Sequence, residues 1–211
     1  MRLSTISRGL PQTVVNNGSP VATGIFKTPV DQPVMVTATG LEGDGQADLE
    51  NHGGLDKAVY AYTVENYAYW QETLGRPAMP HGQFGENFTV EGMPDEAVCV
   101  GDIFRVGALL MQVTQPRVPC FKLGIRMAMP EFVGLFMVSG RVGFYLRVLE
   151  GGEVQAGAGI ERVHADEEAL NIRDCMLALQ EGPRQEEVIR RALSVAALSA
   201  AWRASLLRRI G

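Results

Sequence analysis

The sequence predicts a mainly β protein with a few helices, three of them in a small extension at the C-terminal end. Of its 211 residues, 24 are glycine and 11 are proline, so turns are frequent. Between these turns, apolar residues alternate with other residues in short runs, the pattern of half-buried strands. From Ala165 onward the composition changes to that of helices. We therefore expect one large β domain over residues 1–164 and a three-helix extension over residues 165–211.

Short strands joined by turns are predicted for the first 40 residues. The sequence Asn-Asn-Gly at 16–18 follows two valines and favours a tight hairpin, because Asn-Gly suits such turns. Residues 25–26 and 34–37 are β-prone. Pro29 and Pro33 exclude a central strand between them, since proline cannot donate a backbone hydrogen bond.

Two glycine-rich polar loops follow. The first, residues 40–57, holds five glycines, and its segment His52-Gly53-Gly54 favours close approach of the backbone to another group. The alternative is a flexible acidic surface loop. The second loop, residues 81–90, carries Glu86 and Asn87 and leads into a strand.

A strand and a helix are predicted between these loops. Residues 58–62 are β-prone, and Thr63 is suited to cap the helix that follows. Apolar residues then recur at helical spacing as far as Leu74, and Gly75 and Pro77 end the pattern.

The most unusual stretch is residues 115–122, QPRVPCFK. A strand with alternating pattern, residues 109–114, leads directly into it. Cys120 follows two prolines, which stiffen the turn, and lies between Arg117 and Lys122. Nearby cations stabilise a thiolate, the form of cysteine that attacks electrophiles or binds metals.

The other two cysteines, Cys99 and Cys175, are predicted to be inert packing residues. Three scattered cysteines provide neither a disulfide framework nor a zinc site.

Charge is distributed unevenly along the chain. The net charge is −5, which argues against a surface that binds a nucleic acid polymer. Between residues 103 and 149, however, six bases accompany the single acid Glu131. This local excess is either a solvated basic face or an anion site, with phosphate the natural ligand for arginine.

The rest of the β domain and the extension follow from patterning. Residues 125–138 are apolar and form either core or a short helix lining a pocket, while residues 144–149 and 160–163 are predicted strands. In the extension we expect helices at 165–179, from Pro183, and after a cap at Ser199. So small a unit should dock on the β domain or on another subunit, the latter giving a homodimer.

No signal peptide and no apolar run of about 18 residues is apparent, so we expect no membrane association. A reducing, cytoplasmic location is expected.

Six segments resemble, in order, the successive motifs of MOSC domains, the family named after the C-terminal domain of molybdenum cofactor sulfurase. They are GDGQAD, HGGLDKA, FGEN, GD, QPRVPCFK and GFYLRV, at residues 43–48, 52–58, 84–87, 101–102, 115–122 and 143–148. Residues 165–166, 171–172 and 198–203 resemble the three-helix extension of stand-alone bacterial members linked to 6-N-hydroxylaminopurine resistance.

The resemblance implies a β-barrel-like domain that binds molybdenum cofactor (molybdopterin), with Cys120 as the molybdenum ligand and a catalytic residue. A thiolate is a suitable soft ligand. Phosphate and pterin contacts are then expected from Lys57, Arg117, Lys122, Tyr145 and Arg147. From the chemistry we also expect Asn87 to hydrogen-bond the pterin edge. His52 and Glu86 are the candidate catalytic proton donors, because reducing N–OH to N–H needs protons delivered near the metal.

Three functions remain open at this stage. The first is an oxidoreductase that reduces small N-hydroxylated purines or related compounds, a detoxification. Its electrons would come from a redox partner protein, because the chain has no flavin, nicotinamide or iron–sulfur motif. The second is a non-catalytic cofactor carrier or sulfur-transfer module. The third is metal-free chemistry with Cys120 as nucleophile and His52 as base.

Overall fold

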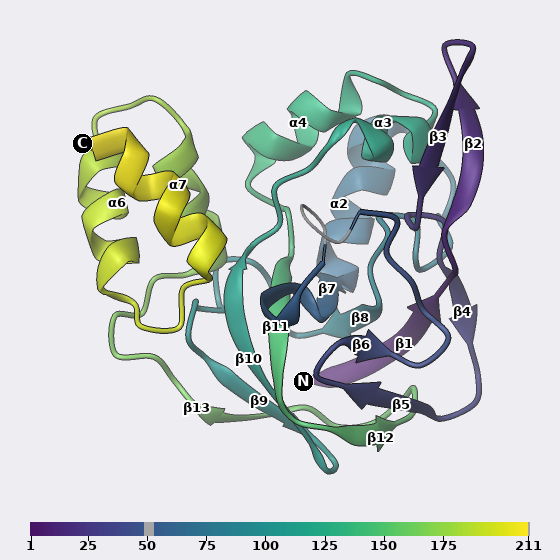
Figure 1. The fold of residues 1–211 in the computed structure, drawn as a ribbon, viewed down its shortest axis with the longest axis horizontal. Coiled ribbons are helices and arrows are strands. Elements are labelled where there is room, and N and C mark those ends of the chain that lie inside the picture. The colour runs from purple at the N-terminus through teal and green to yellow at the C-terminus, as the bar shows by residue number, and fades with distance from the viewer. Residues whose placement is uncertain (49–52, 211) are drawn as a thin grey trace.

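One large, strongly curled sheet forms the body of the molecule (Figure 1). The computed structural model describes residues 1–48 and 53–210. The strand order is β13-β9-β10-β11-β7-β8-β1-β4, and only the β7–β8 pair among these described strands is parallel. The strands are β1 (Arg2–Arg8), β4 (Thr28–Val30), β7 (Val59–Thr63), β8 (Phe88–Glu91), β9 (Ile103–Val106), β10 (Leu109–Pro116), β11 (Phe144–Glu150) and β13 (Glu161–His164). The mainly β prediction is confirmed.

Two smaller sheets flank this body. One has the order β12 (Gly152–Val154), β5 (Val34–Thr37), β6 (Gly40–Leu41). The other is the hairpin of β2 (Gln12–Asn16) and β3 (Ser19–Thr23), which projects from the molecule in Figure 1. Asn17 and Gly18 at its tip have φ of 50° and 78°, so the tight Asn-Gly turn is confirmed. The β-prone residues 25–26 form no strand, and β4 with Pro29 lies at the sheet edge.

Helices α2 (Val64–Leu74), α3 (Phe121–Met127) and α4 (Phe132–Ser139) pack against the body, and the short helix η1 (Leu55–Lys57) precedes β7. The apolar segment 125–138 thus forms parts of two helices. An aromatic cluster joins α2 to α4: the centroid of the Trp70 ring lies 4.7 Å from that of Phe132 and 5.9 Å from that of Phe136. Gly75 ends α2 in the left-handed conformation, as predicted.

The C-terminal extension consists of α5 (Ile172–Cys175), η2 (Met176–Leu179), α6 (Gln185–Ser194) and α7 (Ala200–Ile210). The expectation that a helix begins at Ala165 is wrong. Asp166 instead receives a backbone hydrogen bond from Glu168, and its own N–H donates to Asp102. These side chains, with the Ala169 N–H that donates to the Asp166 carbonyl at 3.0 Å, hold residues 166–169 in a turn. The first helix begins only after Asn171, whose side chain caps it.

The extension docks on the body through polar contacts. Arg147 forms an ion pair with Asp56 at 2.8 Å and donates to the Ala197 carbonyl at 2.9 Å. The Ser199 N–H donates to the Thr114 carbonyl of β10 at 3.1 Å. Ser199 also accepts from the Trp202 N–H at 3.2 Å, so its predicted capping role is confirmed. No helix among the described residues is long and apolar enough to cross a membrane.

Candidate functional site

Cys120 lies in the turn between strand β10, which ends at Pro116, and helix α3, which begins at Phe121. Its backbone is extended, and its carbonyl accepts from the Leu123 N–H at 2.9 Å in the first turn of α3. The Arg117 N–H donates to the Gly143 carbonyl at 3.1 Å, and this bond connects the proline-rich turn to the residue that precedes strand β11. The thiol is half-buried and lines a pocket of the body.

This pocket is open to solvent and holds about 580 Å³ of empty space, counted to its open mouth. It is built from segments far apart in the sequence: residues 23–27, the loop 45–48, the region 57–60, Gly85 and Asn87, the turn 117–122, and Tyr145 of β11. Both glycine-rich loops singled out from the sequence therefore contribute to its wall.

The pocket is basic. Its described lining includes the cations Lys27, Lys57, Arg117 and Lys122, against the single acid Asp48. Of the six bases counted between residues 103 and 149, only two, Arg117 and Lys122, reach this lining. The arrangement favours an anionic ligand, because opposing charges are weakly screened in a partly enclosed site.

Arg117 is the best-fixed of these cations. Its side chain is buried, and Nη1 donates to the Phe84 carbonyl at 2.8 Å and to the Tyr60 hydroxyl at 3.2 Å. The guanidinium carbon also lies 4.7 Å from the centre of the Tyr60 ring. Burial raises the pKa of Tyr60, which keeps its hydroxyl protonated and able to donate to the Val142 carbonyl. A guanidinium carries five N–H groups, so others remain for an anion in the pocket.

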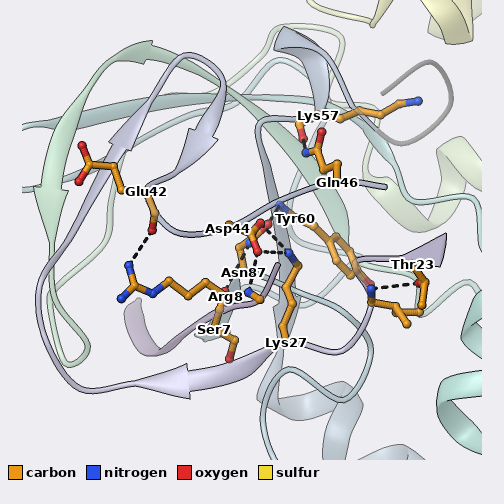
Figure 2. A network of polar contacts seen from close by, with 12 residues as sticks. Ser7, Arg8, Thr23, Lys27, Glu42, Asp44, Gln46, Lys57, Tyr60 and Asn87 are labelled. Carbon is orange, nitrogen blue, oxygen red and sulfur yellow. Dashed lines mark hydrogen bonds and ion pairs between the residues drawn. The ribbon is translucent and has the colours of Figure 1, made fainter. Parts of the chain in front are cut away.

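Lys27 is a pocket residue that the sequence analysis missed. Figure 2 shows its ammonium paired with the Asp44 carboxylate, and both side chains are only 8% exposed. Asp44 also accepts from the Gly9 N–H at 2.9 Å and from the Asn87 amide at 2.8 Å. Burial lowers the pKa of Lys27, an effect that Asp44 opposes. No local pattern could have revealed this pair, because the partners are 17 residues apart and meet only when the chain folds.

Residues 48–161 match the model of the MOSC domain. This chain belongs to the MOSC domain family. Residues 182–210 match a second model, the YiiM-like, 3-alpha helix domain. The predicted resemblance is therefore confirmed for the β domain and for the extension.

Several relatives cover most of this MOSC chain. It is 42% identical over 205 residues to uncharacterized protein YflK of Bacillus subtilis, which spans 97% of this chain and 92% of that protein. Protein YiiM of Escherichia coli is 36% identical over 194 residues, covering 91% and 85% respectively. A protein named "Reductase" from Gibberella moniliformis is 36% identical over 162 residues, which is 74% of this chain but 29% of that protein.

A solved structure agrees with this assignment. The crystal structure of YiiM from Geobacillus stearothermophilus has a TM-score of 0.83 and 34% identity, and the match covers 100% of this chain and 99% of that one. The similarity therefore includes both the β body and the helical extension.

Asn87 lines the pocket, but its side-chain amide is already engaged. Oδ1 accepts from the Tyr60 N–H at 3.2 Å, and Nδ2 donates to Asp44 and, at 3.4 Å, to the Ser7 carbonyl. The geometry therefore favours a bracing role for Asn87 over the expected hydrogen bond to a pterin.

Glu86 does not face the pocket, so the structure does not support its expected role as proton donor. Its side chain is fully buried and is absent from the described lining. The carboxylate accepts from the Gly82 N–H at 2.7 Å, the Phe84 N–H at 3.1 Å and the Thr89 hydroxyl at 2.9 Å, as well as from the Tyr67 hydroxyl. These bonds hold the second glycine-rich loop in shape.

Arg147 also lies elsewhere than expected. It is outside the described pocket lining and joins β11 to Asp56 and to the extension. Tyr145, two residues earlier, does line the pocket, with its ring 5.3 Å from that of Tyr60.

Lys57 and Lys122 line the pocket as expected. Burial lowers the pKa of Lys57, and Asp56 and Asp48 oppose this shift. The expectation for His52 falls outside the described residues.

The two remaining cysteines lie outside the described lining of the pocket. Burial raises the pKa of both Cys99 and Cys175, so each holds its proton more tightly than a free thiol. Cys120 is thus the thiol that this pocket presents to a ligand.

Proposed function

We propose that the pocket beside Cys120 binds molybdenum cofactor, and that the protein reduces N-hydroxylated purines or related N-hydroxylated compounds. The observation that carries this proposal is a half-buried thiol in one pocket with three cations, Lys57, Arg117 and Lys122, in addition to the Lys27–Asp44 pair. A thiolate can ligate the metal, and cations neutralise the charge of a phosphate.

The residues present fit such a group. Arg117 would hold the phosphate, because its position is fixed by two hydrogen bonds that leave donors free. Lys57 and Lys122 would add charge from the pocket wall. Tyr60 and Tyr145 provide an aromatic wall for a flat pterin ring. Cys120 would bind the metal, and when bound the cofactor supplies a centre that exchanges electrons with the substrate.

The proposed reaction converts an N-hydroxylated amine to the amine. The N–O bond breaks, two electrons and two protons are consumed, and the hydroxyl group leaves as water. A redox partner protein provides the electrons. Lys57 is suited to supply a proton at its Nζ, because its lowered pKa makes it a stronger acid than an ordinary lysine. His52 keeps its expected role as a proton donor.

Cofactor content is the first test. Protein from a cofactor-competent host is assayed for molybdenum and pterin, as the native chain, as Cys120→Ala and as Cys99→Ala. Cys99 is a matched control because it is a half-buried thiol outside the described pocket lining. We expect native protein and Cys99→Ala to carry both components and Cys120→Ala to lose molybdenum.

Two results would change this assignment. If native protein carries no cofactor even after reconstitution, the proposal fails, and Cys120 should be examined as a plain nucleophile. If protein that carries the cofactor (loaded protein) does not reduce an N-hydroxylated purine when an electron donor is supplied, the protein is better described as a cofactor carrier or sulfur-transfer module.

A further inference from the structure

A second cavity lies between the β body and the C-terminal extension. It encloses about 900 Å³ of empty space, counted to its open mouth. The body contributes Lys57, Gln115 and Tyr145, and the extension contributes Leu179, Trp202 and Arg209. Lys57 and Tyr145 also line the pocket beside Cys120, so the two spaces meet at these side chains.

Gln115 gives this cavity a specific polar group. The residue is only 3% exposed, and its Nε2 donates to the Pro116 carbonyl at 3.3 Å. Its Oε1 is buried and accepts no hydrogen bond from the part of the chain that the structure describes. Leaving a buried acceptor unpaired costs free energy, because the group has lost its hydrogen bonds to water. Oε1 itself has almost no accessible surface, so a ligand in the cavity reaches it once the Gln115 amide turns toward the cavity. An N–H or O–H group of that ligand would then remove this cost.

The rest of the lining defines the ligand further. Tyr145 and Trp202 are aromatic surfaces for a flat ring. Lys57 and Arg209 are cations, and the described lining contains no acid. Arg209 is exposed, so its charge lies toward solvent and not in the interior. The cavity therefore suits a flat heterocycle with a hydrogen-bond donor and an anionic group.

We propose that this second cavity is the substrate subsite, and that it takes an N-hydroxylated purine as the 5′-nucleotide in preference to the free base. This inference rests on the proposed reductase function. The base donates an N–H or N–OH hydrogen to Gln115 Oε1 and packs against Tyr145 and Trp202. The phosphate binds to Arg209, with Lys57 adding positive charge at the boundary with the first pocket.

Binding can be measured without cofactor or turnover. The probes are adenosine 5′-monophosphate and adenine, the amine products of the nucleotide and of the base. The chain has two tryptophans, and of these Trp202 lines the cavity whereas Trp70 is outside its described lining, so quenching by a ligand in this cavity reports on Trp202. In a Trp202→Phe variant this quenching should disappear, which identifies Trp202 as the source of the fluorescence signal.

Arg209→Gln and Arg208→Gln form a matched pair, because both arginines are exposed on α7 but only Arg209 lines the cavity. We expect Arg209→Gln to weaken binding of the nucleotide about tenfold, because one charge-assisted contact with the phosphate is lost, and to leave the affinity for adenine unchanged. Arg208→Gln should change neither affinity by more than about twofold. Gln115→Met should weaken both ligands about tenfold.

The outcomes separate the two proposals. If nucleotide and base bind equally well, or if the two arginine variants behave alike, the nucleotide subsite is refuted, and reduction of N-hydroxylated purine by loaded protein would still support the reductase function. If the binding pattern is as expected but loaded protein reduces neither substrate, the nucleotide site stands and the reductase function fails. Because Arg209 is on the surface, its variant tests the inference even if Gln115→Met does not fold.

Discussion

Removing the carboxylate of Asp44 tests whether the buried ion pair holds the pocket wall together. The Asp44→Ala substitution leaves the Lys27 ammonium without its partner in a site where both side chains are 8% exposed. It also removes the acceptor for the Gly9 N–H and the Asn87 amide. Breaking a buried pair by deleting one partner costs about 3–5 kcal/mol, because the remaining charge stays desolvated. We expect a loss of that size in the free energy of unfolding.

The assay is urea denaturation followed by circular dichroism, with Glu186→Ala as control. Glu186 pairs with Arg190 on α6, where the two side chains are 68% and 72% exposed, so its loss should cost under about 0.5 kcal/mol. The double variant Lys27→Met with Asp44→Ala removes both charges. Its loss should be smaller than the sum of the two single losses by about 1–3 kcal/mol.

The pH dependence provides a second check. Burial already lowers the pKa of Lys27 in the native protein, and removal of Asp44 lowers it further. Since the unfolded chain then binds the proton more tightly than the folded one, stability of Asp44→Ala should rise with pH from the lowered pKa up to the ordinary lysine value. A loss under about 1 kcal/mol, with no recovery at alkaline pH, would refute the reasoning.

Three other substitutions test separate parts of the structure. Because burial lowers the pKa of Lys57, the affinity of the pocket for phosphate should fall as pH rises through that lowered value. Lys57→Arg should keep its affinity at alkaline pH, since arginine stays charged, and calorimetry measures both affinities. At Gly143, with φ of 67°, an added Cβ would lie 2.4 Å from a backbone oxygen. Gly143→Ala should therefore lower the free energy of unfolding in urea by at least about 2 kcal/mol. Gly18→Ala, at φ of 78° in open space, should lower it less. Arg147→Met removes the ion pair with Asp56 and a bond to the extension, so thermal unfolding should show a loss of about 1–2 kcal/mol; an unchanged melting temperature would contradict this docking role.

Features set by local chemistry could be predicted from the sequence. Asn-Gly fixes a tight hairpin, Gly75 ends a helix, and Ser199 caps another, because each effect acts within a few residues. The turn carrying Cys120 was also identified, since its prolines and cations are neighbours in the chain. The first helix of the extension was misplaced because Asp166 is held by Asp102, which is 64 residues earlier.

The family, the mainly β body, the helical extension and the thiol between two cations could all be predicted from the chain alone. Which polar side chains reach the pocket could not, because it depends on how distant segments pack. Tyr145 and Arg147 lie on the same face of β11, yet the second is about 7 Å further along the strand, so it meets the extension instead of the pocket. Glu86 is turned inward by four donors, and Lys27 is brought to the wall by Asp44. Strand alternation defines a face, but the partner on that face depends on segments that meet only when the chain folds.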